Sequence, residues 1–140
     1  MKKYQLIIVG GGPGGYTAAF RAAELGMSVA IVDDNDLGGV CLNWGCIPTK
    51  SLLKNAEVFE LISNASSYGI EVGKPKLHFE KIIDKTIQAR KRLSKGLHFP
   101  VRKLGVDFFP GFATFIDQST IEVDGNTLHG ETDIYHCNRF

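Results

Sequence analysis

Two cysteines, Cys41 and Cys46, lie five residues apart in a stretch, residues 38–50, that also contains glycines, a proline and a lysine. A regular α-helix would separate them by at least about 7.5 Å along its axis, whereas a disulfide needs Cα atoms about 4.4–6.8 Å apart. A disulfide between them therefore requires a distorted backbone, which Gly45 permits. A bridge across so short a ring is expected to be strained and reactive, and a helix that begins here would lower the thiol pKa. The pair predicts redox chemistry.

Three other interpretations of the cysteine pair stay open at this point: a stabilising disulfide, a metal site and inert thiols. A stabilising disulfide across so short a loop would constrain the unfolded chain little, and nothing marks the protein as secreted. The spacing is loose for zinc, and no second ligand pair follows it. We expect no metal site, since the histidines are scattered over the sequence at His78, His98, His129 and His136.

A glycine-rich stretch, residues 10–15, lies upstream of the cysteines and precedes a predicted helix over residues 16–25. Gly10, Gly12 and Gly15 have the spacing of a dinucleotide fingerprint. These glycines allow a tight turn, a close approach of phosphate to the backbone, and close packing of helix on strand. The amides at the helix N-terminus would hold the phosphates. The predicted phosphate-binding residues are Gly10, Gly12, Pro13, Gly14 and Gly15.

Two predicted strands flank this stretch and support the dinucleotide site. Residues 4–9 and 28–32 are short apolar runs rich in β-branched residues, typical of buried parallel strands. Asp33 ends the second run, 18 residues after Gly15, which suits an acid that hydrogen-bonds a ribose hydroxyl. Asp34 is expected to be a solvated loop charge beside that acid, and we include it among the cofactor-binding candidates.

The remainder of the chain predicts two helices followed by short strands. A helix over residues 51–62 follows the cysteines, and Pro48 is tolerable only near its start. Lys50 lies four residues beyond Cys46 and could share a helix face with it. A basic surface helix is expected over residues 79–95, its charges forming a solvated face. Short strands are then expected at residues 106–109, 113–116, 120–123 and 127–129, with a hairpin turn at Asp124-Gly125.

Length, charge and cysteine count narrow the class of protein. The chain of 140 residues suits one domain, and a net charge of +1 argues against nucleic acid or an acidic membrane as partner. No apolar run approaches the length of a membrane span, and no signal peptide is expected. Three cysteines are not a disulfide framework. We therefore expect a cytoplasmic protein whose disulfide is catalytic.

These motifs resemble those of the pyridine nucleotide-disulfide oxidoreductases, flavoproteins of the dihydrolipoamide dehydrogenase and glutathione reductase type. The resemblance runs from about residue 5 to about residue 133, and its most specific part is Gly-Gly-x-Cys-x-x-x-Gly-Cys-x-Pro at residues 38–48. Within the family, residues 41–50 look most like dihydrolipoamide dehydrogenase. Glutathione and mercuric reductases more often carry valine at the positions of Leu42, Trp44 and Ile47.

The resemblance implies FAD as cofactor, with its pyrophosphate at the glycine-rich stretch and its ribose at Asp33, where the family more often has glutamate. Cys41 would be the interchange thiol that meets the substrate, and Cys46 the thiol in charge-transfer contact with the flavin. Lys50 would lie near flavin N5. Cys41, Cys46 and Lys50 are thus both catalytic and cofactor-binding candidates. The other implied cofactor-binding residues are Gly38, Gly39, Val40 and Ala113.

The function implied by the resemblance is oxidation of dihydrolipoamide, with electrons passing through the cysteine pair and FAD to NAD. The implied partners are the lipoamide-bearing acyltransferase of a 2-oxo acid dehydrogenase complex and a second copy in a homodimer. Two alternatives are an FAD-binding module without catalysis and a fragment of a glutathione or mercuric reductase-type enzyme.

The expected fold is α/β, a Rossmann-like FAD-binding domain with a parallel sheet, helices and a small antiparallel β-meander, incomplete relative to the family. Residues 1–134 would form part of the FAD-binding domain, with the NAD and dimerisation domains absent and a sheet edge or face left uncovered. Residues 135–140 depart from the family's apolar strand. We interpret them as an aberrant tail produced by a frameshift, which would make Cys137 an accident rather than a third redox thiol.

Overall fold

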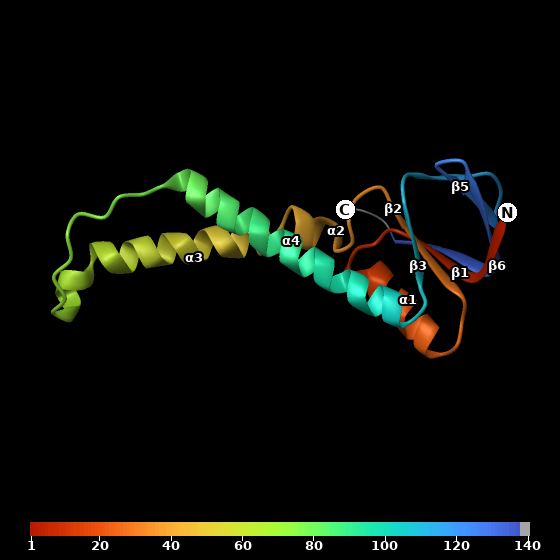
Figure 1. The fold of residues 1–140 in the computed structure, drawn as a ribbon, viewed down its shortest axis with the longest axis horizontal. Helices are drawn as coiled ribbons and strands as arrows, with labels where there is room; N and C mark the ends of the chain where they lie inside the picture. Colours follow the sequence, from red (N-terminus) through yellow and green to blue (C-terminus); the bar gives the residue numbers. More distant parts are fainter. Residues whose placement is uncertain (138–140) are drawn as a thin grey trace.

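The computed structural model describes residues 1–137, which form a six-stranded sheet and a pair of long helices that project from it (Figure 1). The strand order is β3-β2-β1-β6-β5-β4. The first four strands in this order are parallel, and β4, β5 and β6 form an antiparallel meander, so the predicted α/β architecture is confirmed. The strands are β1 (Lys2–Val9), β2 (Val29–Asp33), β3 (Asp107–Pro110), β4 (Ala113–Phe115), β5 (Thr120–Val123) and β6 (Asn126–His136).

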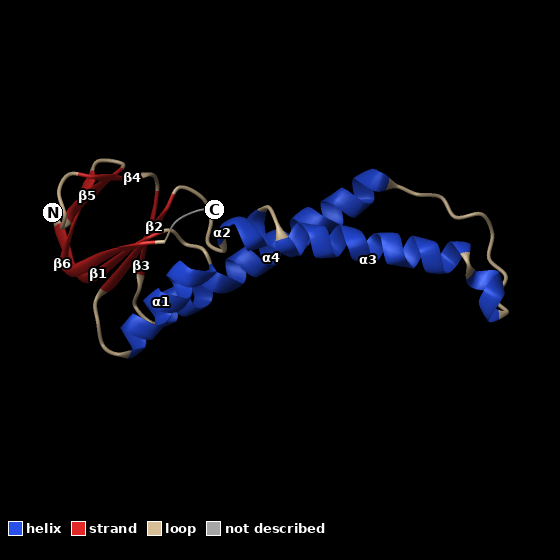
Figure 2. Cartoon of the chain, turned by 180° about the vertical axis from the view of Figure 1, so that it is seen from behind, coloured by secondary structure: helices blue, strands red, loops and turns tan. Residues whose placement is uncertain are grey.

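The helices lie mainly on one face of the parallel strands β1 and β2, and the sheet curls so that the meander packs over their other face (Figure 2). They are α1 (Pro13–Glu24), α2 (Gly39–Asn43), α3 (Cys46–Ser63) and α4 (Phe79–Lys103), with a 3-10 helix at Ala65–Tyr68. Ile8 packs with Ala19 of α1, whereas its neighbour Ile7 packs with Ile121 and Leu128 of the meander. Successive side chains of β1 therefore pack into two separate cores, as the two-residue period of a strand requires.

Strand β6 is longer than the sequence predicted. It pairs with β5 through its first residues and with β1 along its length, with a register shift between Tyr4 and Leu6. The prediction that this strand ends at residue 129 was wrong, because the added residues are largely polar and β1 imposes their extended form through backbone pairing. Tyr135 and His136 therefore belong to the sheet, and the Cys137 amide donates to the Val9 carbonyl at 2.8 Å. The rest of the proposed tail, residues 138–140, lies outside the described residues.

Helix α4 continues beyond its predicted end at residue 95. It passes Gly96 and includes Pro100 in its last turns, although each disfavours a helix interior. Leu97 and Val101 pack into the core beneath the sheet, and this burial outweighs the local penalties. The N-terminal half of α4 pairs with α3 in an arm away from the sheet (Figure 1). Helix α3 buries none of its residues, so one surface of the arm is uncovered.

Candidate functional site

The glycine-rich stretch turns the chain from β1 into α1. Gly10 has φ +114°, a conformation that favours glycine, and its amide donates to the Val32 carbonyl at 2.7 Å. Helix α1 starts at Pro13, three residues before its predicted start, and has no side-chain cap. Proline at this position removes a donor that would have had no helical partner. The remaining amides of the first turn, from Gly14 and Gly15, belong to a helix N-terminus without a side-chain cap, a feature that favours anions.

Asp33 ends β2 beside this loop and is only 6% exposed. Its carboxylate accepts hydrogen bonds from the amides of Gly11 at 2.7 Å and Asn35 at 2.8 Å. The sequence pointed to a ligand-binding role, and the structure adds a second one: Asp33 holds the glycine-rich turn against the end of β2.

Cys41 and Cys46 form a disulfide with Cα atoms 4.7 Å apart. Cys41 lies in α2 and Cys46 begins α3, so the predicted distortion is a break between two helices at Trp44 and Gly45. A Cβ atom at Gly45 would lie 3.2 Å from the Val40 carbonyl oxygen, which is a tighter contact than side chains normally make. Glycine is therefore favoured here by close approach, not by a left-handed backbone conformation.

The disulfide-bearing helix packs directly on the glycine-rich loop. Gly39 has φ +59°, and a Cβ atom there would lie 2.6 Å from the Cα of Gly12. The amide of Gly38 donates to the Gly11 carbonyl at 2.9 Å. Two glycine backbones thus meet without side chains between them. This contact places the cysteine pair next to the N-terminus of α1.

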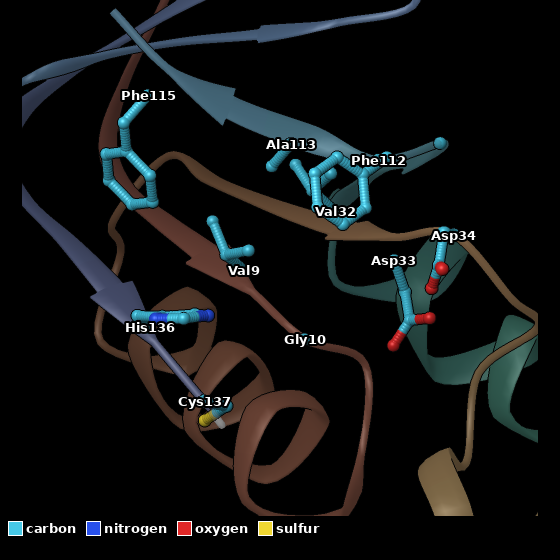
Figure 3. Close-up of a pocket in the computed structure, with 11 residues that line it drawn as sticks. Val9, Gly10, Val32, Asp33, Asp34, Phe112, Ala113, Phe115, His136 and Cys137 are labelled. Atoms are coloured by element: carbon cyan, nitrogen blue, oxygen red, sulfur yellow. The ribbon is translucent and has the colours of Figure 1, made fainter. Parts of the chain in front are cut away.

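Two adjoining cavities follow the carboxyl ends of β1 and β2, where α/β sheets bind ligands. The strand cavity, of about 460 Å³, lies beside Phe112, Ala113 and Phe115 (Figure 3). The disulfide cavity, of about 450 Å³, lies between the start of α1 and Cys41. The two share Gly10, Asp33, His136 and Cys137, and together they form one cleft, which we call the dinucleotide cleft.

Most of the predicted site residues line this cleft. They are Gly10, Gly12, Pro13, Gly14, Gly15, Asp33, Asp34, Gly39, Val40, Cys41 and Ala113. Gly38, Cys46 and Lys50 are not among the lining residues, and Lys50 is exposed on α3. Gly38 nevertheless directly precedes the lining residue Gly39, and Cys46 is bonded to the lining residue Cys41.

Other lining residues were missed by the sequence argument. Val9 and Val32 end the two central parallel strands, and the strand-end rule could have found them. Tyr135, His136 and Cys137 carry no such signal, because they reach the cleft only through the unpredicted extension of β6. His136 also makes an edge contact with Phe115, with ring centroids 6.2 Å apart.

Residues 4–134 match the family described as pyridine nucleotide-disulphide oxidoreductase. The chain belongs to this family. The family binds flavin, and the dinucleotide cleft fits such a group: it has an uncapped helix terminus, a glycine backbone that a Cβ atom would block, and cavities of ligand size.

Proteins named dihydrolipoyl dehydrogenase match almost all of this chain over a minor part of their own length. The protein from Zymomonas mobilis is 44% identical over 131 residues, which are 94% of this chain and 28% of that protein. The protein from Acholeplasma laidlawii is 41% identical, covering 91% of this chain and 38% of its own length. The protein from Mycobacterium tuberculosis is 41% identical, covering 90% and 27%. This chain thus spans well under half the length of these curated relatives.

Within residues 1–137, no three or more His, Cys, Asp or Glu side chains are grouped so that they could hold a metal ion. Among the helices of the same residues, none combines the length and apolar character needed to cross a bilayer.

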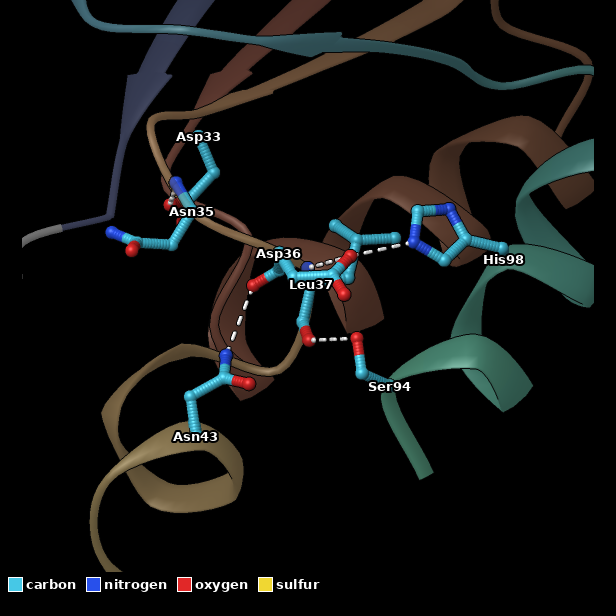
Figure 4. Close-up of polar contacts among 7 residues, drawn as sticks. All are labelled: Asp33, Asn35, Asp36, Leu37, Asn43, Ser94 and His98. Carbon is cyan, nitrogen blue, oxygen red and sulfur yellow. Dashed lines mark hydrogen bonds and ion pairs between the residues drawn. The ribbon is translucent and has the colours of Figure 1, made fainter. Parts of the chain in front are cut away.

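A polar network holds the loop between β2 and α2 (Figure 4). The His98 Nε2 lies 2.7 Å from an Asp36 carboxylate oxygen, and the buried Ser94 hydroxyl donates to the Leu37 carbonyl at 3.2 Å. Asn43 donates from its side chain to the Asp36 carbonyl at 3.0 Å. Helix α4 and the end of α2 therefore fix the loop that leads into Gly39 and the disulfide.

Replacing Asp36 by asparagine is expected to lower the free energy of unfolding at pH 7 by less than about 1 kcal/mol, as for other exposed ion pairs. Partial burial raises the pKa of this carboxyl, but bonds from His98 and Ser94, attraction to His98 and the Leu37 amide outweigh it, so its pKa is lowered. The carboxylate therefore stabilises the fold above about pH 4, and this contribution is lost as the pH falls through its folded pKa.

Denaturant unfolding of wild type and variant at pH 7 and at pH 3 measures this effect. The difference between the two proteins should shrink at the lower pH. Asp84→Asn, which removes the same charge from an exposed position on α4, is the control and should change little. A difference that is equal at both pH values would contradict the assignment.

Proposed function

We propose that this chain binds FAD along the dinucleotide cleft and provides the FAD-binding and disulfide-bearing part of a dihydrolipoamide dehydrogenase. The observation that supports the proposal is the backbone contact between Gly39 and Gly12, since it brings the Cys41–Cys46 disulfide to the cavity at the N-terminus of α1. The relatives named dihydrolipoyl dehydrogenase support the choice of substrate class.

Different residues of the cleft would bind different parts of the cofactor. The pyrophosphate would lie on the amides of Gly14 and Gly15, the ribose at Asp33, and the adenine in the strand cavity near Ala113. FAD, when bound, supplies the two-electron relay between the thiols and NAD. Lys50 is proposed to lie near the reactive end of the cofactor, where its charge would favour the reduced state.

The cysteine pair would carry the exchange with the dithiol. A thiolate of dihydrolipoamide attacks the Cys41 sulfur, a new S–S bond forms, and the Cys41–Cys46 bond breaks to leave Cys46 as thiolate. The second thiol of the substrate then attacks the mixed disulfide, which releases lipoamide and Cys41 as thiol. Two electrons thereby pass to the cysteine pair, and lipoamide gains its internal disulfide.

The proposal includes the partners and location that the family resemblance implies. We propose a homodimer, a lipoamide-bearing acyltransferase as the source of the dithiol, and the cytoplasm as location. Support for an apolar contact comes from α3, which exposes Leu53, Val58, Leu61 and Ile62 to solvent. An isolated arm of this kind favours coverage by another protein surface.

The purified 140-residue chain is expected to bind FAD and to show no NAD-linked oxidation of dihydrolipoamide. The cleft is complete enough to hold the cofactor, but the chain spans only 28% of its Zymomonas relative. Flavin absorbance of the isolated protein and titration with FAD and with FMN measure binding. FAD should bind at least about 10-fold more tightly than FMN, because only FAD reaches the strand cavity. Equal affinity would contradict the proposed position of the adenosine.

Cys46, the sulfur expected to contact the flavin, does not line the cleft, which favours a second candidate function, an FAD-binding module without catalysis. The two candidates differ in the fate of the disulfide. A module would hold FAD while dihydrolipoamide left the cysteine pair oxidised. Reduction of the pair by dihydrolipoamide, counted as two newly alkylated cysteines, would exclude the module.

A further inference from the structure

Four side chains of α4, spaced four residues apart, contact the disulfide-bearing segment from the end of β2 into α3. We call them the α4 stripe, which consists of Thr86, Arg90, Ser94 and His98. Residues four apart lie on the same face of an α-helix, so the stripe extends about 18 Å along that face. Its partners follow in the opposite chain direction, from Asp36 before α2 to Ser51 in α3.

The C-terminal half of the stripe holds the entrance to α2. His98 and Ser94 contact Asp36 and Leu37 through the bonds described above (Figure 4). Leu37 is fully buried, and the chain reaches Gly39 and α2 two residues later. This end of the disulfide segment is therefore fixed both by α4 and by the glycine-rich loop.

Arg90 contacts the segment at the break between the two helices. Its guanidinium carbon lies 5.6 Å from the centre of the Trp44 indole ring, in a cation–π arrangement. Trp44 follows the last residue of α2, and Gly45 and Cys46 come next. Arg90 therefore acts on the backbone between the two cysteines through Trp44.

Thr86 holds the beginning of α3. Its hydroxyl oxygen lies 2.8 Å from that of Ser51, and it donates to the Ile82 carbonyl at 2.9 Å. A hydroxyl has one hydrogen, so Ser51 is the donor and Thr86 the acceptor in the bond between the two helices. Ser51 follows Cys46 by five residues in the same helix, so this bond fixes the rotation and height of the helix that carries Cys46.

The burial pattern of α4 indicates that the stripe positions the segment as well as packing against it. The buried residues of this 25-residue helix are Thr86, Ser94 and Val101. The first two are hydroxyl side chains bonded to the disulfide segment. Apolar pairs of the same shape would stabilise the packing about as well. Hydrogen bonds, however, have a preferred direction, so they fix the register of α4 against the segment.

Reduction of the disulfide removes the covalent link between α2 and α3, whose bridged Cα atoms are 4.7 Å apart. The relative placement of the two thiols then depends on non-covalent contacts across the break. The bond from Gly38 to Gly11 holds only the α2 side, whereas the α4 stripe has contacts before, at and after the break. The stripe is therefore built to act as a splint when the disulfide is open.

We propose that the α4 stripe keeps the two thiols adjacent in the reduced protein, with Thr86 and Arg90 as positioning residues. The inference rests on the proposed function, because it concerns the same Cys41–Cys46 pair in its cycle between disulfide and dithiol. Contacts that hold two thiols together raise their effective concentration and lower the entropy cost of closing the bond. Loss of a stripe contact therefore makes the disulfide easier to reduce.

Equilibration of the purified chain with mixtures of reduced and oxidised dithiothreitol measures this preference. The reagent gives up two electrons and two protons and closes its own cyclic disulfide, while the Cys41–Cys46 bond opens to two thiols. Alkylation followed by mass spectrometry counts those thiols. The equilibrium constant for closing the protein disulfide should fall about 3-fold in Arg90→Gln and about 5-fold in Thr86→Val. Circular dichroism checks that each oxidised variant is folded.

Two controls match these variants. Arg92→Gln removes the same type of side chain from an exposed position two residues further along, on the opposite face of α4, and should leave the constant unchanged. Thr86→Ser keeps the hydroxyl and should retain the wild-type constant. Because Thr86 carries no charge, a shift in Arg90→Gln alone would be an effect of charge on the thiols and would overturn the proposal. Unchanged constants in both variants, or an equal shift in Arg92→Gln, would overturn it as well.

Amide hydrogen exchange tests the reduced state directly. The Trp44 amide donates to the Val40 carbonyl at 2.8 Å and the Thr49 amide to the Gly45 carbonyl at 3.0 Å, so these amides report on both sides of the break. In reduced wild type both should be as protected as in the oxidised chain. In reduced Thr86→Val they should exchange about 5-fold faster, while the oxidised variant matches oxidised wild type. Loss of protection in reduced wild type would reject the proposal.

Failure of the proposed function gives a different result. A wild-type disulfide that dithiothreitol reduces and dihydrolipoamide does not would refute the lipoamide activity. The equilibrium constants and exchange rates of the variants would still decide the role of the α4 stripe, because neither measurement uses dihydrolipoamide.

Discussion

Replacing Cys46 by serine is expected to abolish reduction of the chain by dithiols, the largest effect predicted for this protein. The wild-type disulfide stores two oxidising equivalents in one bond between α2 and α3. Serine cannot form that bond, so an incoming thiolate finds no disulfide to attack. Cys41→Ser should have the same consequence. The loss is complete and not graded, because each sulfur is one half of the reacting bond.

The measurement is a count of alkylated cysteines before and after treatment with dihydrolipoamide. Wild type should gain two, and both serine variants should gain none. Cys137→Ser is the control and should still gain two, because burial raises the pKa of the Cys137 thiol and makes it a poor nucleophile. Reduction-dependent alkylation that persisted in Cys46→Ser, or vanished in Cys137→Ser, would show that the reactive disulfide is another pair.

The same variants separate the proposed roles of the two sulfurs. With FAD bound, Cys41→Ser should retain the long-wavelength absorbance of a thiolate beside the flavin, and Cys46→Ser should lack it. The test is needed because Cys41 lines the disulfide cavity and Cys46, the proposed flavin contact, does not. The reverse pattern would exchange the two assignments and leave the redox function intact.

Replacing Gly15 by alanine is expected to lower the free energy of unfolding by about 1–3 kcal/mol and to weaken FAD binding at least about 10-fold. Alanine is favoured over glycine inside a helix by about 1 kcal/mol, which alone would stabilise α1. The new Cβ atom, however, would lie 1.8 Å from the Gly10 carbonyl oxygen. That oxygen belongs to the backbone, so the turn itself must move, and the steric cost exceeds the helix preference.

Gly14→Ala is the matched control for the fold. Among the described residues 1–137, a Cβ atom at Gly14 would meet only the Cys137 sulfur, at an ordinary contact distance of 3.6 Å. Its unfolding free energy should therefore equal or slightly exceed that of wild type. Denaturant unfolding and FAD titration give both quantities. A Gly15→Ala protein as stable as Gly14→Ala would show that the turn relaxes without cost.

Local sequence features predicted several elements well. The runs before Gly10 and before Asp33 formed parallel strands, and Asp124-Gly125 formed a hairpin turn in which both residues have positive φ. Each signal depends on residues that are neighbours in the chain. Apolar β-branched runs favour buried strands, and glycine or aspartate tolerates the left-handed conformation of a tight turn.

Predictions failed where distant segments outweighed local preference. Helix α4 continues through Gly96 and Pro100 because Leu97 and Val101 are buried beneath the sheet. Strand β6 continues to His136 because β1 offers a partner for its backbone. Neither reason is visible within a short window of sequence, and the second one carries His136 and Cys137 into the dinucleotide cleft.

The sequence by itself determined the family, the glycine loop, the acid that ends β2 and the need for a broken helix between Cys41 and Cys46, because each depends on residue type and spacing along the chain. Only the tertiary structure decided that Gly39 rests on Gly12, that Asp33 also holds the Gly11 amide, and that Arg90 covers Trp44. Such contacts join segments far apart in the chain, and their geometry depends on how the helices pack on the sheet.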